Sequence, residues 1–149
     1  MKSSVFGAAG NVGRRIVNEA LSRGHEVTAI VRSSDQRKKL PDDLNVQIGN
    51  AIDIDDVIRL STGQDLVINA TRSATSDVDE VVLMTETIMK GLAHSRARLL
   101  VIGGAASLVT PGTDGKKVID SPQFLDASLR HIGEASIAQY EACLKEKRV

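Results

Sequence analysis

A run of small residues close to the amino terminus, Gly7-Ala8-Ala9-Gly10-Asn11-Val12-Gly13, constrains the fold more than any other stretch of the chain. It follows a short apolar segment that ends at Phe6. It precedes apolar residues at helical spacing, which are Val12, Ile16, Val17, Ala20 and Leu21. A glycine-rich turn between a strand and a helix directs backbone N–H groups and the positive end of the helix to one point, where a diphosphate binds. The pattern therefore predicts a dinucleotide-binding turn, in which a Cβ at Gly10 would block the approach of the ligand.

The rest of the chain alternates between strand and helix patterns. Gly24 is expected to end the first helix, and residues 25–32 form a β-branched run typical of a buried parallel strand. Further strands are expected over residues 44–48, 66–70 and 99–102, and helices over residues 81–92 and 132–146. A short helix capped by Asp53 should turn four residues inward, which are Ile54, Val57, Ile58 and Leu60. Polar connections are expected over residues 33–41 and 71–77.

This alternation predicts an α/β fold with a Rossmann-type, doubly wound parallel sheet in the strand order 3-2-1-4-5. A ligand of such a sheet lies beyond the carboxyl ends of the strands, where the strand order reverses. Three connections should meet there: the glycine turn, the loop from Asn69 to Ser73, and the end of the second strand at Arg32.

Charge and composition exclude several classes of function. Lysine plus arginine and aspartate plus glutamate both total 19, so a basic field that would attract nucleic acid is not expected. The apolar runs are as short as strands and the first ten residues lack a signal-peptide pattern, so we expect a cytoplasmic protein without membrane association. Cys143 is the only cysteine, which excludes an internal disulfide, and no cluster of residues suggests a metal site.

Arg32 bears on which dinucleotide binds. An acidic residue about twenty positions after the glycines usually holds the ribose 2′-hydroxyl of NAD, whereas an arginine accommodates the 2′-phosphate of NADP. Arg32 occupies that position, and the nearest acid, Asp35, comes three residues later. A guanidinium group binds phosphate through two hydrogen bonds, which favours NADP(H), with NAD(H) as the alternative. The other interpretation of Arg32 is a solvated charge at the end of a strand.

Five segments in this order, VFGAAGNVG, LSRGHEVTAIVRS, QIGNAIDIDDV, DLVINA and LLVIGGAASL, resemble the atypical short-chain dehydrogenase/reductase family. The similarity is to its NAD(P)H-binding branch, which includes flavin reductase or biliverdin reductase B, regulators like the nitrogen-repression regulator, and quinone reductases. The family's adenine-lining loop usually reads G-D-x-x-D, and Asn50 replaces its first acid. The cofactor contacts that the resemblance implies are Gly7, Ala9, Gly10, Asn11, Val12, Gly13, Arg32, Asn50, Ala51, Ile52, Ala70 and Thr71.

The catalytic group is harder to locate. Short-chain dehydrogenases commonly use Tyr-x-x-x-Lys, but the residue four positions after Tyr140 is Leu144, and Lys145 lies about 100° further around a helix. The resemblance places Ser107 at the border of the reaction centre, and we take it as the candidate catalytic residue.

We expect a single NAD(P)-binding domain over residues 1–149, which lacks the carboxyl-terminal part present in similar proteins and has an apolar edge that favours a homo-oligomer. The expected activity is hydride transfer from NADP(H) to a small acceptor such as a flavin or quinone. The alternatives are a redox sensor that binds NADP(H) without turnover, and a protein like the sugar-nucleotide epimerases and dehydratases.

Overall fold

The computed structural model describes residues 1–73 and 77–147 of the chain, so part of the polar connection predicted over residues 71–77 lies outside the described residues. The chain forms two compact units. The first, here called the sheet unit, consists of Met1–Thr71 and Thr87–Ile102. The second, here called the helical unit, consists of Arg72–Glu86 and Gly103–Val149. The prediction of a single domain stays a prediction.

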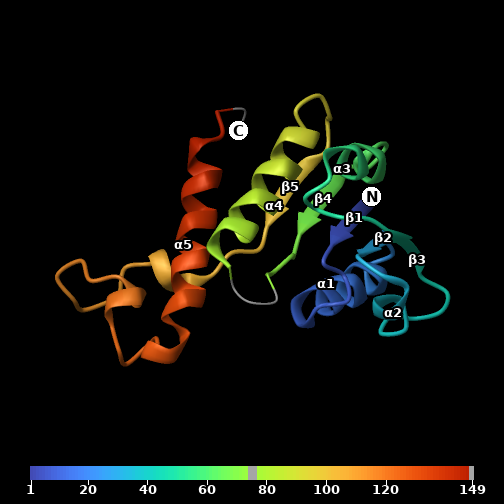
Figure 1. Ribbon diagram of the computed structural model, residues 1–149. Coiled ribbons are helices and arrows are strands. Elements are labelled where there is room, and N and C mark those ends of the chain that lie inside the picture. Colours follow the sequence, from blue (N-terminus) through green and yellow to red (C-terminus); the bar gives the residue numbers. More distant parts are fainter. Residues whose placement is uncertain (74–76, 148–149) are drawn as a thin grey trace. The chain divides into compact units, whose positions relative to one another are not determined.

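The sheet unit is built on five parallel strands in the order β3-β2-β1-β4-β5 (Figure 1). The strands are β1 (Lys2–Phe6), β2 (Glu26–Val31), β3 (Asn45–Ile48), β4 (Leu66–Asn69) and β5 (Arg98–Val101). This order confirms the predicted Rossmann-type sheet. Because the chain crosses from β3 on one side of β1 to β4 on the other, the strand order reverses between β1 and β4.

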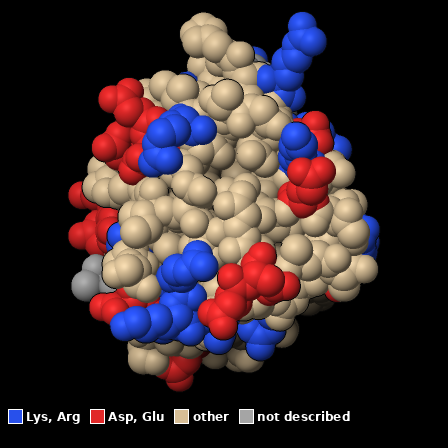
Figure 2. All heavy atoms as spheres, turned by 90° about the vertical axis from the view of Figure 1, so that its right-hand side faces the viewer, with Lys and Arg blue, Asp and Glu red and all other residues tan. Residues whose placement is uncertain are grey.

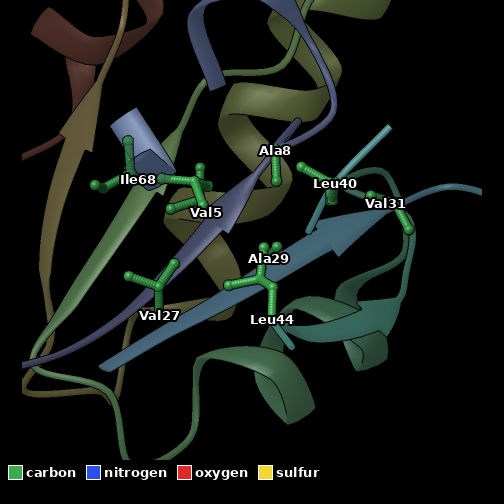
Figure 3. Close-up of a cluster of buried hydrophobic side chains, with 9 residues drawn as sticks. Val5, Ala8, Val27, Ala29, Val31, Leu40, Leu44 and Ile68 are labelled. Carbon is green, nitrogen blue, oxygen red and sulfur yellow. The ribbon is translucent and has the colours of Figure 1, made fainter. Parts of the chain in front are cut away.

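One face of this sheet packs against α1 (Asn11–Ser22). Alternate residues of the central strands point to this face, where they form an aliphatic core with Val17 of the helix. Figure 3 shows these side chains converging from β1, β2 and β4. The cluster consists of Val5, Ala8, Val17, Val27, Ala29, Val31, Leu40, Leu44 and Ile68.

The predicted polar connection after β2 is more ordered than expected. Residues Ser34–Arg37 form the short helix α2, which is too brief to show a hydrophobic period in the sequence. Leu40 and Leu44 follow this helix and are buried in the core cluster, so the connection packs back onto the sheet.

The opposite face of the sheet packs against α3 (Ile54–Ser61), which begins at the predicted Asp53 cap. Val57 and Leu60 are buried as predicted, but Ile54 and Ile58 are exposed by 44% and 48%. The prediction that all four apolar residues face inward is therefore wrong for these two. The helix has only eight residues, and its buried stripe runs through Val57, Leu60 and Ser61 instead.

Within the helical unit, α5 (Arg130–Lys145) is the longest element, and it lies within two residues of the predicted helix. It packs against η1 (Ala105–Ser107), and Gly133 has no space for a side chain because a Cβ there would meet Leu125 at 2.9 Å and Ala106 at 3.3 Å. The buried Gln139 Nε2 donates a hydrogen bond of 3.1 Å to Oγ1 of Thr85. Thr85 belongs to α4 (Val78–Gly91), within which the boundary between the two units falls.

Two short helices, η2 (Val118–Asp120) and η3 (Ala127–Leu129), complete the helical unit. Across the part of the chain that the structure describes, none of the helices combines the length and the apolar character that crossing a bilayer requires.

Candidate functional site

The glycine turn joins β1 to α1 and is held by contacts that only glycine allows at two of its positions. Gly7 has a φ of +79°, and a Cβ on it would lie 2.5 Å from the carbonyl oxygen of Ala70. A Cβ on Gly13 would overlap the Gly7 carbonyl oxygen. The Gly10 N–H donates to that same oxygen at 3.0 Å and closes the turn. Gly7 and Gly13 are therefore required by the internal packing of the turn.

Gly10 has a different role. Its φ is −73° and its ψ is 168°, an extended conformation that any residue adopts, so a side chain at this position causes no backbone strain. A Cβ there would meet one protein atom within 4 Å, the Gly7 carbonyl oxygen at 3.2 Å. The space beside Gly10 is therefore largely open, as it must be for a ligand to approach the backbone.

The amino end of α1 has the properties of an anion site. The first N–H groups of a helix have no acceptor within the helix, and among the described residues no side chain caps this end or adds an acid to its first turn. Two cations lie there instead. Arg14 Nη2 donates to Asn11 Oδ1 at 3.2 Å, and Arg15 Nη1 donates to the Asn11 carbonyl oxygen at 2.8 Å. Positive side chains at the positive end of a helix are unfavourable without an anion, so this helix end suits an anionic group such as a phosphate.

The loop after β4 borders this turn. Asn69 is fully buried, and its Oδ1 accepts hydrogen bonds from the Thr71 N–H at 3.1 Å and from Thr71 Oγ1 at 2.6 Å. The Ala70 N–H donates to the Phe6 carbonyl oxygen at 3.0 Å. These bonds hold Ala70 and Thr71 against Gly7, as predicted for the reversal point of the strand order. The part that Asn69 plays in holding the loop was not predicted.

The end of β2 supplies Arg32, which is exposed and whose backbone N–H donates to Oε1 of Gln36 at 2.8 Å. Asp35, the nearest acid in the sequence, forms an ion pair with Lys38 at 2.8 Å on the exposed surface of α2.

The loop after β3 lies next to Arg32 along the same edge. The Gly49 N–H donates to the carbonyl oxygen of Val31 at 2.9 Å, which joins this loop to the end of β2. Asn50 Oδ1 accepts from the Ile52 N–H at 3.3 Å. Ala51 is buried, whereas Ile52 is 44% exposed. The loop therefore offers an apolar side chain and an amide group beside Arg32.

Asp56 and Arg59 of α3 fix this loop, and neither residue was predicted to belong to the site. Asp56 Oδ2 accepts from the Asn50 N–H at 2.9 Å, and Asp56 Oδ1 accepts from Arg59. The hydrogen bond from Arg59, and then that from Asn50, lower the pKa of the Asp56 carboxyl below its ordinary value of 3.8. Asp56 is therefore ionised at neutral pH.

A hollow of about 640 Å³ lies between α1 and the segment after α2. None of its lining residues is acidic, and three are basic. Its lining consists of Asn11, Arg14, Arg15, Asn18, Lys39, Leu40 and Pro41. Arg14, Arg15 and Lys39 thus add positive charge beside the glycine turn, and a ligand with an additional phosphate would gain most from it.

Charges elsewhere are mixed. Figure 2 shows basic and acidic side chains interspersed over the face that it presents. Among the described residues, no group of three or more His, Cys, Asp or Glu side chains could hold a metal ion.

All twelve predicted cofactor contacts belong to the sheet unit. Nine of them lie in the loops that follow β1, β2, β3 and β4, and the other three, Asn11, Val12 and Gly13, form the first turn of α1. Ser107, the candidate catalytic residue, lies half-buried at the end of η1 in the helical unit. Tyr140 is on α5 and is 51% exposed. Burial raises the pKa of the Cys143 thiol, so this residue is a poor nucleophile.

Comparison with protein families gives the class of this chain. Residues 7–141 match the model of a family described as NAD(P)H-binding. The match begins at the first glycine of the turn and includes all the loops that surround it. The chain belongs to this NAD(P)H-binding family, which confirms the dinucleotide-binding prediction at that level and leaves NADP and NAD undistinguished.

Individual relatives are similar over most of this chain. It is 35% identical over 131 residues to YwnB, an uncharacterised protein of Bacillus subtilis, and this covers 83% of the chain and 57% of YwnB. A Bacteroides thetaiotaomicron protein proposed to be an epimerase has a TM-score of 0.80 and 31% identity, with 99% of this chain and 67% of that chain covered. A Streptococcus pneumoniae protein proposed to be an NADH-flavin reductase has a TM-score of 0.71 and 32% identity, with coverages of 95% and 65%. The chain thus spans between about half and two thirds of the length of these relatives.

Proposed function

We propose that this chain binds NADP(H) and serves a hydride-transferring oxidoreductase that acts on a small acceptor such as a flavin or quinone. The observation that carries the NADP(H) preference is the basic side chains around the dinucleotide site: Arg32 after β2, and Arg14, Arg15 and Lys39 in the neighbouring hollow. A 2′-phosphate placed among them gains charge-assisted hydrogen bonds that a 2′-hydroxyl group cannot form.

The residues present fit a dinucleotide. The diphosphate would lie at the amino end of α1, where Gly10 leaves space and the helix end is uncapped. The nicotinamide ribose would lie beside Ala70 and Thr71, which Asn69 holds in place. The bound cofactor supplies the hydride, so the task of the protein is to orient it and to hold the acceptor close. Ser107 stays our candidate for a polar group at the reaction centre.

Two relatives bear on the reaction. The similarity to a protein proposed to be an NADH-flavin reductase supports a flavin as acceptor. The similarity to a protein proposed to be an epimerase favours a second candidate function. Epimerases of the short-chain dehydrogenase type resemble the dehydrogenases in using a Tyr-x-x-x-Lys motif. This chain lacks the motif, because the residue four positions after Tyr140 is Leu144 and not a lysine. We therefore rank the reductase function above the epimerase function.

Fluorescence titration of the protein with NADPH and NADH tests the cofactor preference. We expect NADPH to bind more tightly, and Arg32→Ala to weaken NADPH binding about tenfold while NADH binding changes little. Arg37→Ala is the matched control, because Arg37 is an exposed arginine at the end of α2. Equal affinities of the wild-type protein for NADPH and NADH would contradict the preference.

A second measurement tests the activity. Oxidation of NADPH is followed with flavin and quinone acceptors, and turnover that depends on the acceptor supports the reductase. Tight NADPH binding without turnover of any acceptor would instead indicate a redox sensor or a cofactor-binding part of a larger protein.

A further inference from the structure

We propose that Asp56 and Arg59 are positioning residues, which hold the loop of residues 49–52 in the shape that receives the adenosine end of the dinucleotide. This inference rests on the proposed function. Its basis is a set of contacts from α3 to both sides of Gly49. Asp56 Oδ2 accepts the Asn50 N–H at 2.9 Å, and Arg59 Nη2 donates to the Ile48 carbonyl oxygen at 3.3 Å as well as to Asp56.

The order of the strands places this loop under the adenosine. The diphosphate belongs at the glycine turn after β1, and the adenosine ribose belongs beside Arg32 after β2. The next strand in the sheet is β3, whose last residue, Ile48, pairs with Val31. A ligand that extends from β1 across the end of β2 therefore brings its base to the loop after β3. That loop presents the exposed Ile52 side chain, an apolar surface for a purine ring.

The loop has little freedom on its inner side. A Cβ on Gly49 would overlap Cδ1 of Leu60, so the main chain lies directly against the buried stripe of α3. On the outer side, Asn50 folds its own Oδ1 back to the Ile52 N–H. The Asp56 carboxylate is thus the α3 side chain that holds the Asn50 N–H, while the N–H of the cap residue Asp53 donates to the Asn50 carbonyl oxygen at 3.1 Å. Without the Asp56 carboxylate, the Asn50 N–H loses its acceptor, and Arg59 loses its charged partner and keeps the Ile48 carbonyl oxygen.

A different side chain from that of Asp56 caps α3. The Asp53 side chain caps this helix by accepting from the Asp55 and Asp56 N–H groups, at 3.0 Å and 3.3 Å. The Asp56 side chain is therefore available to the loop, and removing it leaves the cap intact. Asp55 is in the same helical turn, and its carboxylate is exposed. Among the described residues of the loop, none forms a hydrogen bond or an ion pair with this carboxylate. It provides a matched control of equal charge.

The test compares Asp56→Ala with Asp55→Ala. Dissociation constants are measured for NADPH, for 2′,5′-ADP as the adenosine half, and for reduced nicotinamide mononucleotide as the other half. We expect Asp56→Ala to weaken NADPH and 2′,5′-ADP binding by about three- to tenfold, because binding must then order the loop. Binding of the nicotinamide half should not change, and Asp55→Ala should bind all three ligands as the wild type does.

Asp56→Asn serves as the conservative variant, since its amide oxygen can still accept the Asn50 N–H, and we expect it to recover part of the affinity for 2′,5′-ADP. It also keeps the test valid if Asp56→Ala does not fold. Unchanged 2′,5′-ADP affinity in a folded Asp56→Ala protein would overturn the inference, and so would an equal loss for both halves, which indicates a merely structural role. A wild-type protein that binds neither NADPH nor 2′,5′-ADP would overturn the proposed function itself.

Discussion

Gly7 and Ala70 approach each other so closely that a Cβ on Gly7 would lie 2.5 Å from the Ala70 carbonyl oxygen. This contact joins the end of β1 to the loop after β4, and Gly7 also has a φ of +79°, which disfavours any side chain. Two effects thus require glycine at this position: the backbone conformation and the close approach of a second main chain. They can be separated, because Gly24 has a φ of +74° and no atom within 4 Å of a Cβ built on it.

Gly7→Ala and Gly24→Ala therefore form a matched pair. We expect Gly24→Ala to lower the free energy of unfolding by about 1–2 kcal/mol through backbone strain alone. Gly7→Ala should lower it by that amount and by roughly a further 1–3 kcal/mol, because the loop after β4 must move. Urea unfolding at equilibrium measures both values. If the free energy of unfolding falls equally in the two variants, then the close approach of Gly7 and Ala70 adds nothing to the cost of a side chain at Gly7.

Gly10→Val should affect binding rather than stability. The φ of −73° at Gly10 accommodates valine, and the Gly7 carbonyl oxygen, at 3.2 Å from a new Cβ, needs to shift by only a few tenths of an ångström. The added methyl groups would occupy the space through which a diphosphate reaches the N–H groups of α1. We expect an unfolding midpoint close to that of the wild type together with a loss of NADPH binding, measured by urea unfolding and fluorescence titration. A folded Gly10→Val protein that still binds NADPH would mean that the diphosphate lies elsewhere.

Ser4 lies in β1, the central strand of the sheet, and we expect its side chain to destabilise the fold. It is fully buried, and its Oγ has no hydrogen-bond partner among the described residues. Ser4→Ala removes an unpaired hydroxyl group, so we expect a gain of about 1 kcal/mol in the free energy of unfolding. The neighbouring Ser3 is the control. Its Oγ donates to the Glu26 carbonyl oxygen at 3.3 Å, and Ser3→Ala should cost about 0.5–1 kcal/mol.

Thermal or urea unfolding of the two variants checks this difference in sign. Stabilisation by both substitutions, or by neither, would show that the hydrogen bond of Ser3 does not distinguish these adjacent residues. Ser61 Oγ on α3 is likewise buried without a partner among the described residues, so Ser61→Ala provides an independent repeat of the Ser4 result.

The position of the glycine turn was predictable because it depends on residues close together in sequence. The order of the sheet was predictable because alternating strands and helices with right-handed crossovers allow few arrangements. Apolar β-branched runs mark β2 and β4, and the spacing of Gly7, Gly10 and Gly13 marks the turn. The inward face of α3 was less predictable, since Ile54 and Ile58 are as apolar as Val57 but lie on the exposed side of a helix of eight residues. Composition does not determine which side of so short a helix meets the sheet.

The contacts that position the site could not be predicted from the sequence, for a different reason. Asp56 reaches Asn50 only because the chain turns between β3 and α3, and nothing in the spacing of six residues indicates this contact. Asn69 was similarly predicted only as a residue at the end of a strand. In the structure it is also buried, and its side chain accepts two hydrogen bonds from Thr71. Contacts of this kind depend on the path of the backbone, which the pattern of residue types does not specify.

The lowered pKa of Asp56 makes the stability of the protein depend on pH. Since the folded protein lowers this pKa below 3.8, chiefly through the hydrogen bond from Arg59, the ionised carboxylate stabilises the folded state at neutral pH. That contribution is lost as the pH falls through the folded-state pKa. Wild type and Asp56→Asn should therefore differ by about 0.5–1 kcal/mol in urea unfolding at about pH 7, and by much less at about pH 3. Asp126, whose pKa is lowered by its hydrogen bonds with Ser128, titrates in both proteins, so its effect cancels. A difference that stays constant between the two pH values would show that the charge of Asp56 contributes nothing to stability.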